Sequence, residues 1–187
     1  MGLDMYIRHT TQKEWDANIA HIKKSQEYDT RANELWNNKW SKIIDGLNLP
    51  KTEYGSYDVG KFTPEQNKTV EEYRVELYKI REELGLTDGD YDEDSTQVEI
   101  GYWRKAWALH DLIVKVTNTT GNDNCERMLL TKDMCKEIIA KIANGLKSTG
   151  KYDFWDNEHS SKYTIDVMKE AIKAIDDGRI VYYLAWY

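Results

Sequence analysis

The chain has 187 residues, of which 33 are acidic and 26 are basic, so its formal net charge is −7. That charge repels a phosphate backbone over most of the surface and excludes a general nucleic-acid-binding protein, although a local basic pocket stays possible. No run of about 18 apolar residues occurs, so no membrane-spanning helix is expected. The length and the 40% hydrophobic content predict a single domain, residues 1–187.

The predicted elements begin and end with a strand. In LDMYIRH, residues 3–9, apolar and polar residues alternate, which is the period of a strand with one buried face. At the other end RIVYYLAWY, residues 179–187, is rich in β-branched and aromatic side chains, which favour strands. We expect these two terminal strands to pair.

Most of the chain between them has helical patterns. A long helix is expected over 14–47, capped by Thr10 or Thr11, stopped at Gly46 and bent or broken near 29–30. The later expected elements are a loop over 47–62, a helix from Thr63 to Gly85, a helix over 98–116, a helix from Thr131 to Gly145, and a helix from Ser160 to Gly178. The predicted fold is therefore α+β and helix-dominated, with about five helices and a small sheet that pairs the N- and C-terminal strands.

The loop TDGDYDEDST, residues 87–96, is the first segment that could bind a metal. Acidic residues stand at positions 1, 3, 5, 7 and 12 of an EF-hand calcium loop: Asp88, Asp90, Asp92, Asp94 and Glu99. The sixth position, where that loop turns and needs glycine, holds Glu93 instead. We therefore expect a solvated acidic loop, with calcium binding as the less favoured alternative.

The chain lacks the short motifs that identify a P-loop, a dinucleotide-binding turn, a serine hydrolase or a zinc site. Its four histidines are scattered, and Cys125 and Cys135 form no CxxC pair. An isolated thiol is more often a small buried hydrophobe than a nucleophile. No metal and no cofactor are expected. The start has no apolar signal-peptide region, so we expect a reducing cytoplasm.

The stretch EIGYWRKAWALHDLIV, residues 99–114, has two interpretations, both of which treat it as a helix. In the first it is a core helix whose histidine is hydrogen-bonded internally and whose cations lie on the surface. In the second its rings stack on a ligand, a cation holds a phosphate or carboxylate, and the histidine donates a hydrogen bond. Aromatic clusters at 151–155 and 182–187 would converge on it. The candidate ligand-binding residues are Tyr102, Trp103, Arg104, Lys105, Trp107, His110, Trp155 and Tyr183.

Two stretches, MGLDMYI at 1–7 and the stretch at 99–114, resemble a set of small bacteriophage and prophage proteins. Those proteins begin MGLDMYL and carry a central element E-[VI]-x-Y-W-R-K-A-N-x-[IL]-H. The two motifs span about 23 residues of this chain, and a late Tyr-rich helix and an aromatic C-terminal strand extend the likeness loosely. Trp107 departs from the pattern, which has asparagine at that position.

The resemblance implies a phage accessory protein in the cytoplasm of the host bacterium. With the aromatic and basic cluster, it leads us to expect a counter-defence protein that binds and sequesters a nucleotide-derived small-molecule immune signal. A protein–protein inhibitor of a host defence enzyme is one alternative, with exposed Trp and Tyr as its anchors. A small nucleotide-processing enzyme is the other, and its candidate acids or bases are Glu99, Asp4 and His110. We expect capture of the ligand without its conversion.

Overall fold

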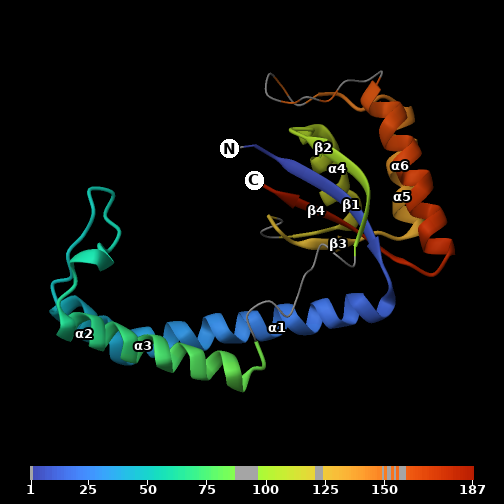
Figure 1. The fold of residues 1–187 in the computed structure, drawn as a ribbon. Helices are drawn as coiled ribbons and strands as arrows, with labels where there is room; N and C mark the ends of the chain where they lie inside the picture. Colours follow the sequence, from blue (N-terminus) through green and yellow to red (C-terminus); the bar gives the residue numbers. More distant parts are fainter. Residues whose placement is uncertain are drawn as a thin grey trace. The chain divides into compact units, whose positions relative to one another are not determined.

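The computed structural model describes residues 2–86, 97–120, 124–148, 150, 153, 155 and 159–187 (Figure 1). The chain divides into two compact units. The sheet unit contains residues 1–16 and 93–187, and the hairpin unit contains residues 17–92. The single domain expected from the chain length stays a prediction, and the two units are described separately.

The sheet unit is built on one antiparallel sheet with the strand order β2-β1-β4-β3. Its strands are β1 (Asp4–Thr10), β2 (Val98–Arg104), β3 (Arg127–Leu129) and β4 (Ile180–Trp186). The predicted pairing of the terminal strands is confirmed, because β1 pairs with β4 along its whole length. Three helices, α4 (Trp107–Thr117), α5 (Lys132–Ala143) and α6 (His159–Asp176), contribute to the core under this sheet (Figure 1). The helix-dominated α+β class is therefore also confirmed.

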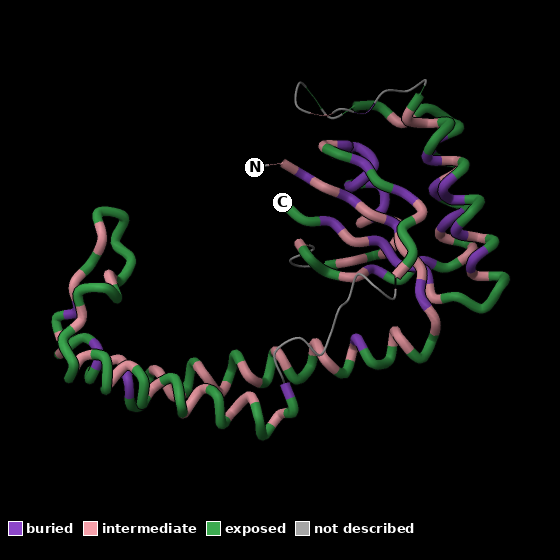
Figure 2. Tube along the Cα trace, viewed as in Figure 1, coloured by how far each residue is buried: buried purple, intermediate pink, exposed green. Residues whose placement is uncertain are grey.

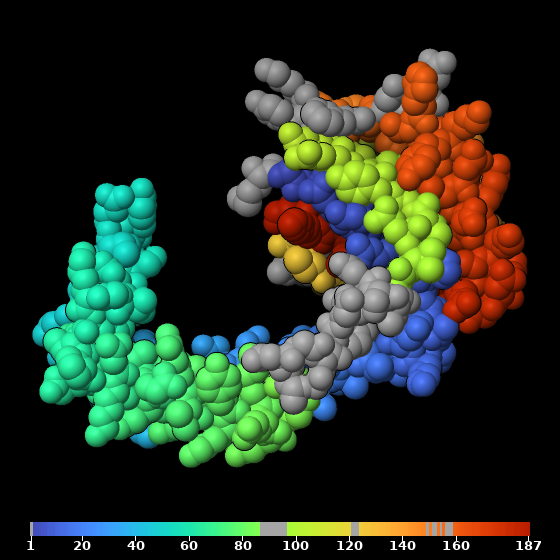
Figure 3. Space-filling view, viewed as in Figure 1, coloured from blue at the N-terminus to red at the C-terminus, as the bar shows by residue number. Residues whose placement is uncertain are grey.

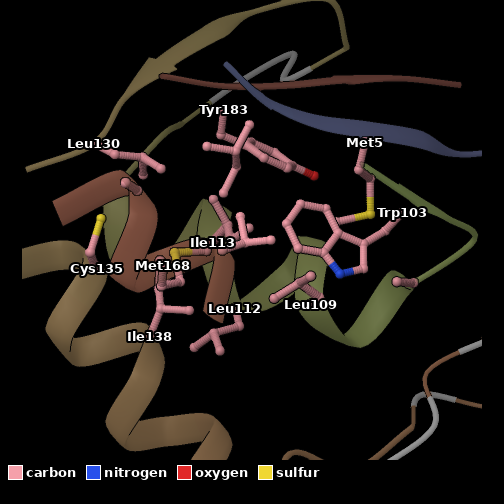
Figure 4. Close-up of a cluster of buried hydrophobic side chains, with 14 of the residues drawn as sticks. Met5, Trp103, Leu109, Leu112, Ile113, Leu130, Cys135, Ile138, Met168 and Tyr183 are labelled. Atoms are coloured by element: carbon pink, nitrogen blue, oxygen red, sulfur yellow. The ribbon is translucent and has the colours of Figure 1, made fainter. Parts of the chain in front are cut away.

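The core of the sheet unit lies between one face of the sheet and these helices. From residue 3 to residue 7 every second residue is buried, as the alternation in the sequence predicts (Figure 2). The alternation ends there, since His9 is only partly buried and Thr10 is buried. Met5 and Tyr183 on the strands meet Leu109, Ile113 and other helix residues in this core (Figure 4). Each of these four side chains is 0% exposed, and burial of one such side chain contributes about 1.5–3 kcal/mol.

Residues 98–116 do not form the single helix that the sequence predicts. Residues 98–104 are strand β2, Lys105 adopts a left-handed conformation with φ 54°, and helix α4 begins at Trp107. The strand is favoured because β2 can pair with β1 and because Gly101 allows close packing. A Cβ atom added at Gly101 would lie 2.6 Å from Cγ1 of Val167 in α6. As a consequence, Tyr102 and Trp103, which are neighbours in the motif, lie on opposite faces of the sheet.

The two later helices follow their sequence signals closely. Thr131 caps α5, with its Oγ1 accepting a hydrogen bond from the backbone N–H of Met134 at 3.2 Å. Helix α6 is followed by Gly178 in the left-handed conformation, with φ 76°. Strand β3, by contrast, was not expected from the sequence.

The hairpin unit contains most of helix α1 and all of helix α3. Its elements are α1 (Gln12–Leu35, which starts within the sheet unit), a π-helical turn η1 (Trp36–Trp40), α2 (Ser41–Gly46), a short 3-10 helix η2 (Val59–Lys61) and α3 (Pro64–Glu83). The long helix predicted over 14–47 is present, but its irregular turn is at 36–40 rather than near 29–30. Helix α3 begins at the predicted cap, where Thr63 and Gln66 form a reciprocal capping box.

The core of the hairpin unit is small. Trp40, Ile44 and Leu49 are buried, and the ring of Trp40 lies 5.5 Å from the ring of Tyr73. None of the 20 residues of α3 is buried (Figure 2). The hairpin unit therefore has far less buried apolar surface than the sheet unit. No helix in the described part of the chain is long and apolar enough to cross a membrane.

Candidate functional site

The face of the sheet that points away from α4, α5 and α6 carries the other half of the strand residues. We call it the outer face. The strand register places three rows on it: Arg104, Asp4 and Trp186; then Tyr102, Tyr6, Leu184 and Arg127; then Glu99, Arg8, Tyr182 and Leu129. Atoms of β1, β2 and β4 lie side by side on the surface of the sheet unit (Figure 3). Polar, basic and aromatic side chains dominate these rows.

A cavity of about 360 Å³ lies at the end of the outer face that carries the first row. Its walls are Gly2, Asp4, Arg104, Asn124, Cys125, Trp186 and Tyr187. The volume falls within the range of small-molecule sites. The cavity brings together both ends of the chain and the end of β2, so the two stretches that carry the phage-protein resemblance meet at this point.

The carboxylate of Asp4 organises the polar wall of the cavity. The hydroxyl of Tyr102 donates a hydrogen bond to Oδ1 of Asp4 at 2.5 Å, and Nε of Arg104 lies 3.9 Å from the same oxygen. The hydrogen bond to Asp4 raises the pKa of the Tyr102 hydroxyl, because ionisation would remove its donor. The Arg104 side chain is 64% exposed, so its guanidinium can reach an anion in the cavity.

Two aromatic residues of the C-terminal segment, Trp186 and Tyr187, also line the cavity. Trp186 is 50% exposed and Tyr187 is 40% exposed. The last residue is held in place, because the backbone N–H of Tyr187 donates to Oδ1 of Asn124 at 2.8 Å and its ring lies 5.7 Å from the ring of Trp107. Because it is half-exposed, the indole of Trp186 offers a stacking surface, and the neighbouring Tyr187 is held by these contacts.

The two cysteines have different environments. Cys125 is exposed in the cavity wall, and its backbone N–H donates to the carbonyl of Ala185 at 2.7 Å. Cys135 is 0% exposed in the core, and burial raises the pKa of its thiol to about 11. Cys135 is thus a protonated core residue at neutral pH.

The structure separates the eight candidate ligand-binding residues that the sequence suggests. Tyr102 and Arg104 are on the outer face, and Lys105 lies in the turn that follows β2. The other five are buried or half-buried, and they are Trp103, Trp107, His110, Trp155 and Tyr183. A ligand-binding role for each of the eight stays a prediction, and of the eight Arg104 alone is part of the cavity wall described above.

The buried members use their polar atoms inside the protein. Nε1 of Trp103 donates to Oγ1 of Thr164 at 2.9 Å, and Nε1 of Trp155 donates to the carbonyl of Leu146 at 3.1 Å. Nδ1 of His110 and the hydroxyl of Tyr183 are 2.7 Å apart. These contacts agree with the first interpretation of the motif, a buried histidine that is hydrogen-bonded internally.

The remaining candidates are dispersed. Residues 88–94 of the suggested calcium loop lie outside the described residues, and Glu99 is an exposed residue of β2 opposite Arg8. Within the ranges that the structure describes, no group of three or more His, Cys, Asp and Glu side chains could hold a metal ion. Of the candidate acids and bases, Asp4 lines the cavity, whereas His110 is buried and Glu99 lies in the third row.

The sequence analysis placed Trp186 and Tyr187 in the aromatic cluster at 182–187 but not among the eight candidate ligand-binding residues, and it did not single out Tyr6. The signal was available in the alternation of the terminal strands, which puts Asp4 and Tyr6 on one face and Met5 on the other. What the sequence lacked was the register that sets Trp186 opposite Asp4.

A wider groove of about 770 Å³ lies on the hairpin unit between the α2 region and α3. Its lining combines three lysines with three glutamates, together with Trp40, Ile43, Thr69 and Val75. Nε1 of Trp40 donates to Glu76 at 3.2 Å, and Lys39 also pairs with Glu76. The indole of Trp40 is only 2% exposed, whereas the cavity of the sheet unit has the half-exposed indole of Trp186 and the largely exposed side chain of Arg104, so that cavity is the better candidate site.

Comparison of the chain with protein-family models, with curated proteins and with solved structures finds no match. The candidate site therefore rests on the geometry of this chain.

Proposed function

We propose that the chain is a phage counter-defence protein that captures a nucleotide-derived small molecule in the cavity of the sheet unit. One observation carries the proposal: a half-exposed indole, Trp186, and a largely exposed guanidinium, Arg104, flank the same carboxylate in the first row of the outer face. A nucleobase stacks on an indole, and a phosphate binds a guanidinium. The Asp4 carboxylate accepts hydrogen bonds from a ribose hydroxyl or a base amine.

Local charge supports an anionic ligand despite the net charge of −7. The three rows of the outer face carry three arginines, Arg8, Arg104 and Arg127, against two carboxylates, Asp4 and Glu99. A small basic area on an acidic protein attracts a small anion while the rest of the surface repels long polyanions. This charge pattern favours a soluble signal molecule over bulk nucleic acid.

Capture without conversion is the simpler activity for this site. Sequestration needs affinity alone, whereas hydrolysis needs an acid or base beside the reacting bond. The carboxylate in the described cavity wall, Asp4, already accepts the hydroxyl of Tyr102 and lies beside Arg104. The carboxylate is thus already engaged as a hydrogen-bond acceptor, which suits it to bind a ligand rather than to transfer protons.

The proposal is tested by ligand release. The chain is purified from phage-infected bacteria, denatured by heat, and the released small molecules are identified by mass spectrometry. We expect an intact nucleotide-derived molecule in near-stoichiometric amount, and its loss in Trp186→Ala and Arg104→Gln. Tyr54→Ala, which removes a ring that is 87% exposed in the hairpin unit, is the matched control and should retain the ligand.

Three outcomes would contradict the proposal. Release of nothing from a well-folded protein, with a stable protein complex on size-exclusion chromatography, would support the inhibitor alternative. Release of a cleaved product, with turnover of added nucleotide, would support an enzyme. Retention of the ligand in both cavity variants would place its site elsewhere on the chain.

A further inference from the structure

We infer that the captured molecule is a short oligonucleotide, with two or three linked nucleotides, rather than a mononucleotide. This inference rests on the proposed function and names the ligand class of the same site. It comes from the second and third rows of the outer face, which lie beyond the cavity.

The second row supplies another aromatic surface. The rings of Tyr6 and Tyr102 lie side by side, with centroids 5.1 Å apart, and the Arg8 guanidinium lies 4.9 Å from the centre of the Tyr6 ring. Tyr6 is the diagonal neighbour of Trp186, since Trp186 is opposite Asp4. Such diagonal positions are about 7–8 Å apart. Two separate rings at this spacing suit two bases that are splayed apart, as single-stranded nucleotides often are when proteins bind them.

The arginines that could hold phosphates lie on opposite edges of the sheet. Arg104 belongs to β2 and Arg127 to β3, which are separated by three inter-strand steps, or about 14 Å. Nε of Arg104 lies near Asp4 of the neighbouring strand, and Nε of Arg127 is buried. Arg104 belongs to the cavity wall described above, and Arg127 does not. A phosphate held in the cavity therefore leaves Arg127 to a further phosphate of a longer chain.

The third row sets the upper limit on length. The ring of Trp15 lies 5.2 Å from the ring of Tyr182, which is only 1% exposed. Gln97 accepts hydrogen bonds from Arg8, at 3.2 Å, and from the hydroxyl of Tyr182. The centre of the face is thus occupied by the protein's own side chains at the third row, although Glu99 and Leu129 at its edges are exposed. Two rows of rings leave room for two or three nucleotides.

The test is a calorimetric titration of the purified full chain with a length series. The probes are adenosine and guanosine nucleotides: the monophosphate, the linear and cyclic dinucleotides and trinucleotides, and the linear hexanucleotide. We expect the di- or trinucleotides to bind at least about tenfold more tightly than the monophosphate, which is the value of one stacked base, with no further gain for the hexanucleotide. The linear and cyclic arms identify which form of the ligand the site prefers.

Variants of the second row locate the effect. Arg127→Gln and Tyr6→Leu should weaken dinucleotide binding about tenfold and leave monophosphate binding unchanged, whereas Trp186→Ala should weaken both. Tyr6→Phe keeps the ring and should bind as the unmodified chain does. Leu129→Ala, in the third row and 50% exposed, is the matched control. Circular dichroism checks that each variant is folded.

The outcomes separate this inference from the proposed function. Equal affinity for the monophosphate and the dinucleotides, or an equal loss of both in Arg127→Gln, would overturn the inference and leave capture at the cavity intact. A continued rise in affinity up to the hexanucleotide would overturn the length limit. Binding of no member of the series by a folded chain that releases no nucleotide would overturn both proposals.

Discussion

The same strands form both faces of the sheet, yet the side chains of one face form the core and those of the other face border the cavity. On the helix-covered face Met5, Ile7 and Tyr183 are 0% exposed and belong to the core. On the outer face their neighbours Asp4 and Trp186 reach a cavity. Stability and the proposed binding therefore depend on alternate residues of one segment, and a change at one position affects one property with little effect on the other.

Aromatic residues with polar atoms occur on both faces, but their polar atoms are used differently. Beneath the sheet, Trp103 and Tyr183 direct their N–H and O–H groups to other buried side chains. On the outer face the Tyr102 hydroxyl meets Asp4 at the edge of the cavity. The seven Trp and 13 Tyr of the composition therefore do not form one binding cluster.

The two faces should differ most in how much stability is lost when a side chain is truncated. Ile113→Ala removes a side chain that is 0% exposed, and we expect it to lower the free energy of unfolding by about 2–5 kcal/mol, because it leaves a cavity. Leu129→Ala on the outer face should change it by about 0.5 kcal/mol or less. Urea denaturation of both variants measures the two values. Equal losses would mean that the outer face is also part of the core.

The next effect comes from filling space under the sheet. In Gly101→Ala the new Cβ would lie 2.6 Å from Val167 and 2.7 Å from the Trp103 ring, so the packing of β2 against α6 must shift. We expect a loss of about 1–3 kcal/mol. Gly46→Ala is the control, since nothing lies within 4 Å of its added Cβ. Thermal unfolding compares the variants, and an unchanged midpoint for Gly101→Ala would contradict the packing described for β2.

A smaller effect is expected from one buried hydrogen bond. Thr164→Val keeps the shape of a fully buried side chain but removes the acceptor of the Trp103 indole N–H. We expect a loss of about 1–2 kcal/mol, because the donor stays buried without a partner. Thr164→Ser keeps the hydroxyl, so it should lose less of the free energy of unfolding than Thr164→Val does. If urea denaturation gives the Thr164→Val variant the same free energy of unfolding as the unmodified chain, this hydrogen bond does not stabilise the fold.

The smallest effect is a dependence on pH at the edge of the covered face. Burial lowers the pKa of His9 below 6.5, the positive charge of Arg179 lowers it further, and Glu170 opposes both. Because the unfolded chain then binds the proton more readily, stability should fall as the pH drops from about 6.5 through the lowered folded pKa. In His9→Gln this contribution to the pH dependence of the free energy of unfolding should disappear.

The control for the pH effect is His159→Gln, which replaces an exposed histidine at the start of α6. The free energy of unfolding is measured by urea denaturation between pH 7.5 and 5. The His159 variant should keep the slope of the unmodified chain. A slope that survives in His9→Gln would assign the pH dependence to other groups.

The sequence by itself determined the elements whose signals are local. The cap at Thr63, the cap at Thr131 and the glycine after α6 each act within three or four residues, so they could be recognised without knowing the rest of the fold. The alternation of the terminal strands likewise identified their buried face. The α+β class followed from these signals together.

Only the tertiary structure decided the form of the central motif and the composition of the cavity. Residues 98–104 carry apolar side chains that fit a helix or a strand, and the pairing of β2 with β1 favoured the strand. The first row joins Asp4, Arg104 and Trp186, which lie far apart along the chain. Local patterns hold no information on strand register, because register depends on the packing of the whole sheet. For that reason Tyr102 and Arg104 are among the candidates that the sequence suggests, whereas Trp186, which lies opposite Asp4, is not.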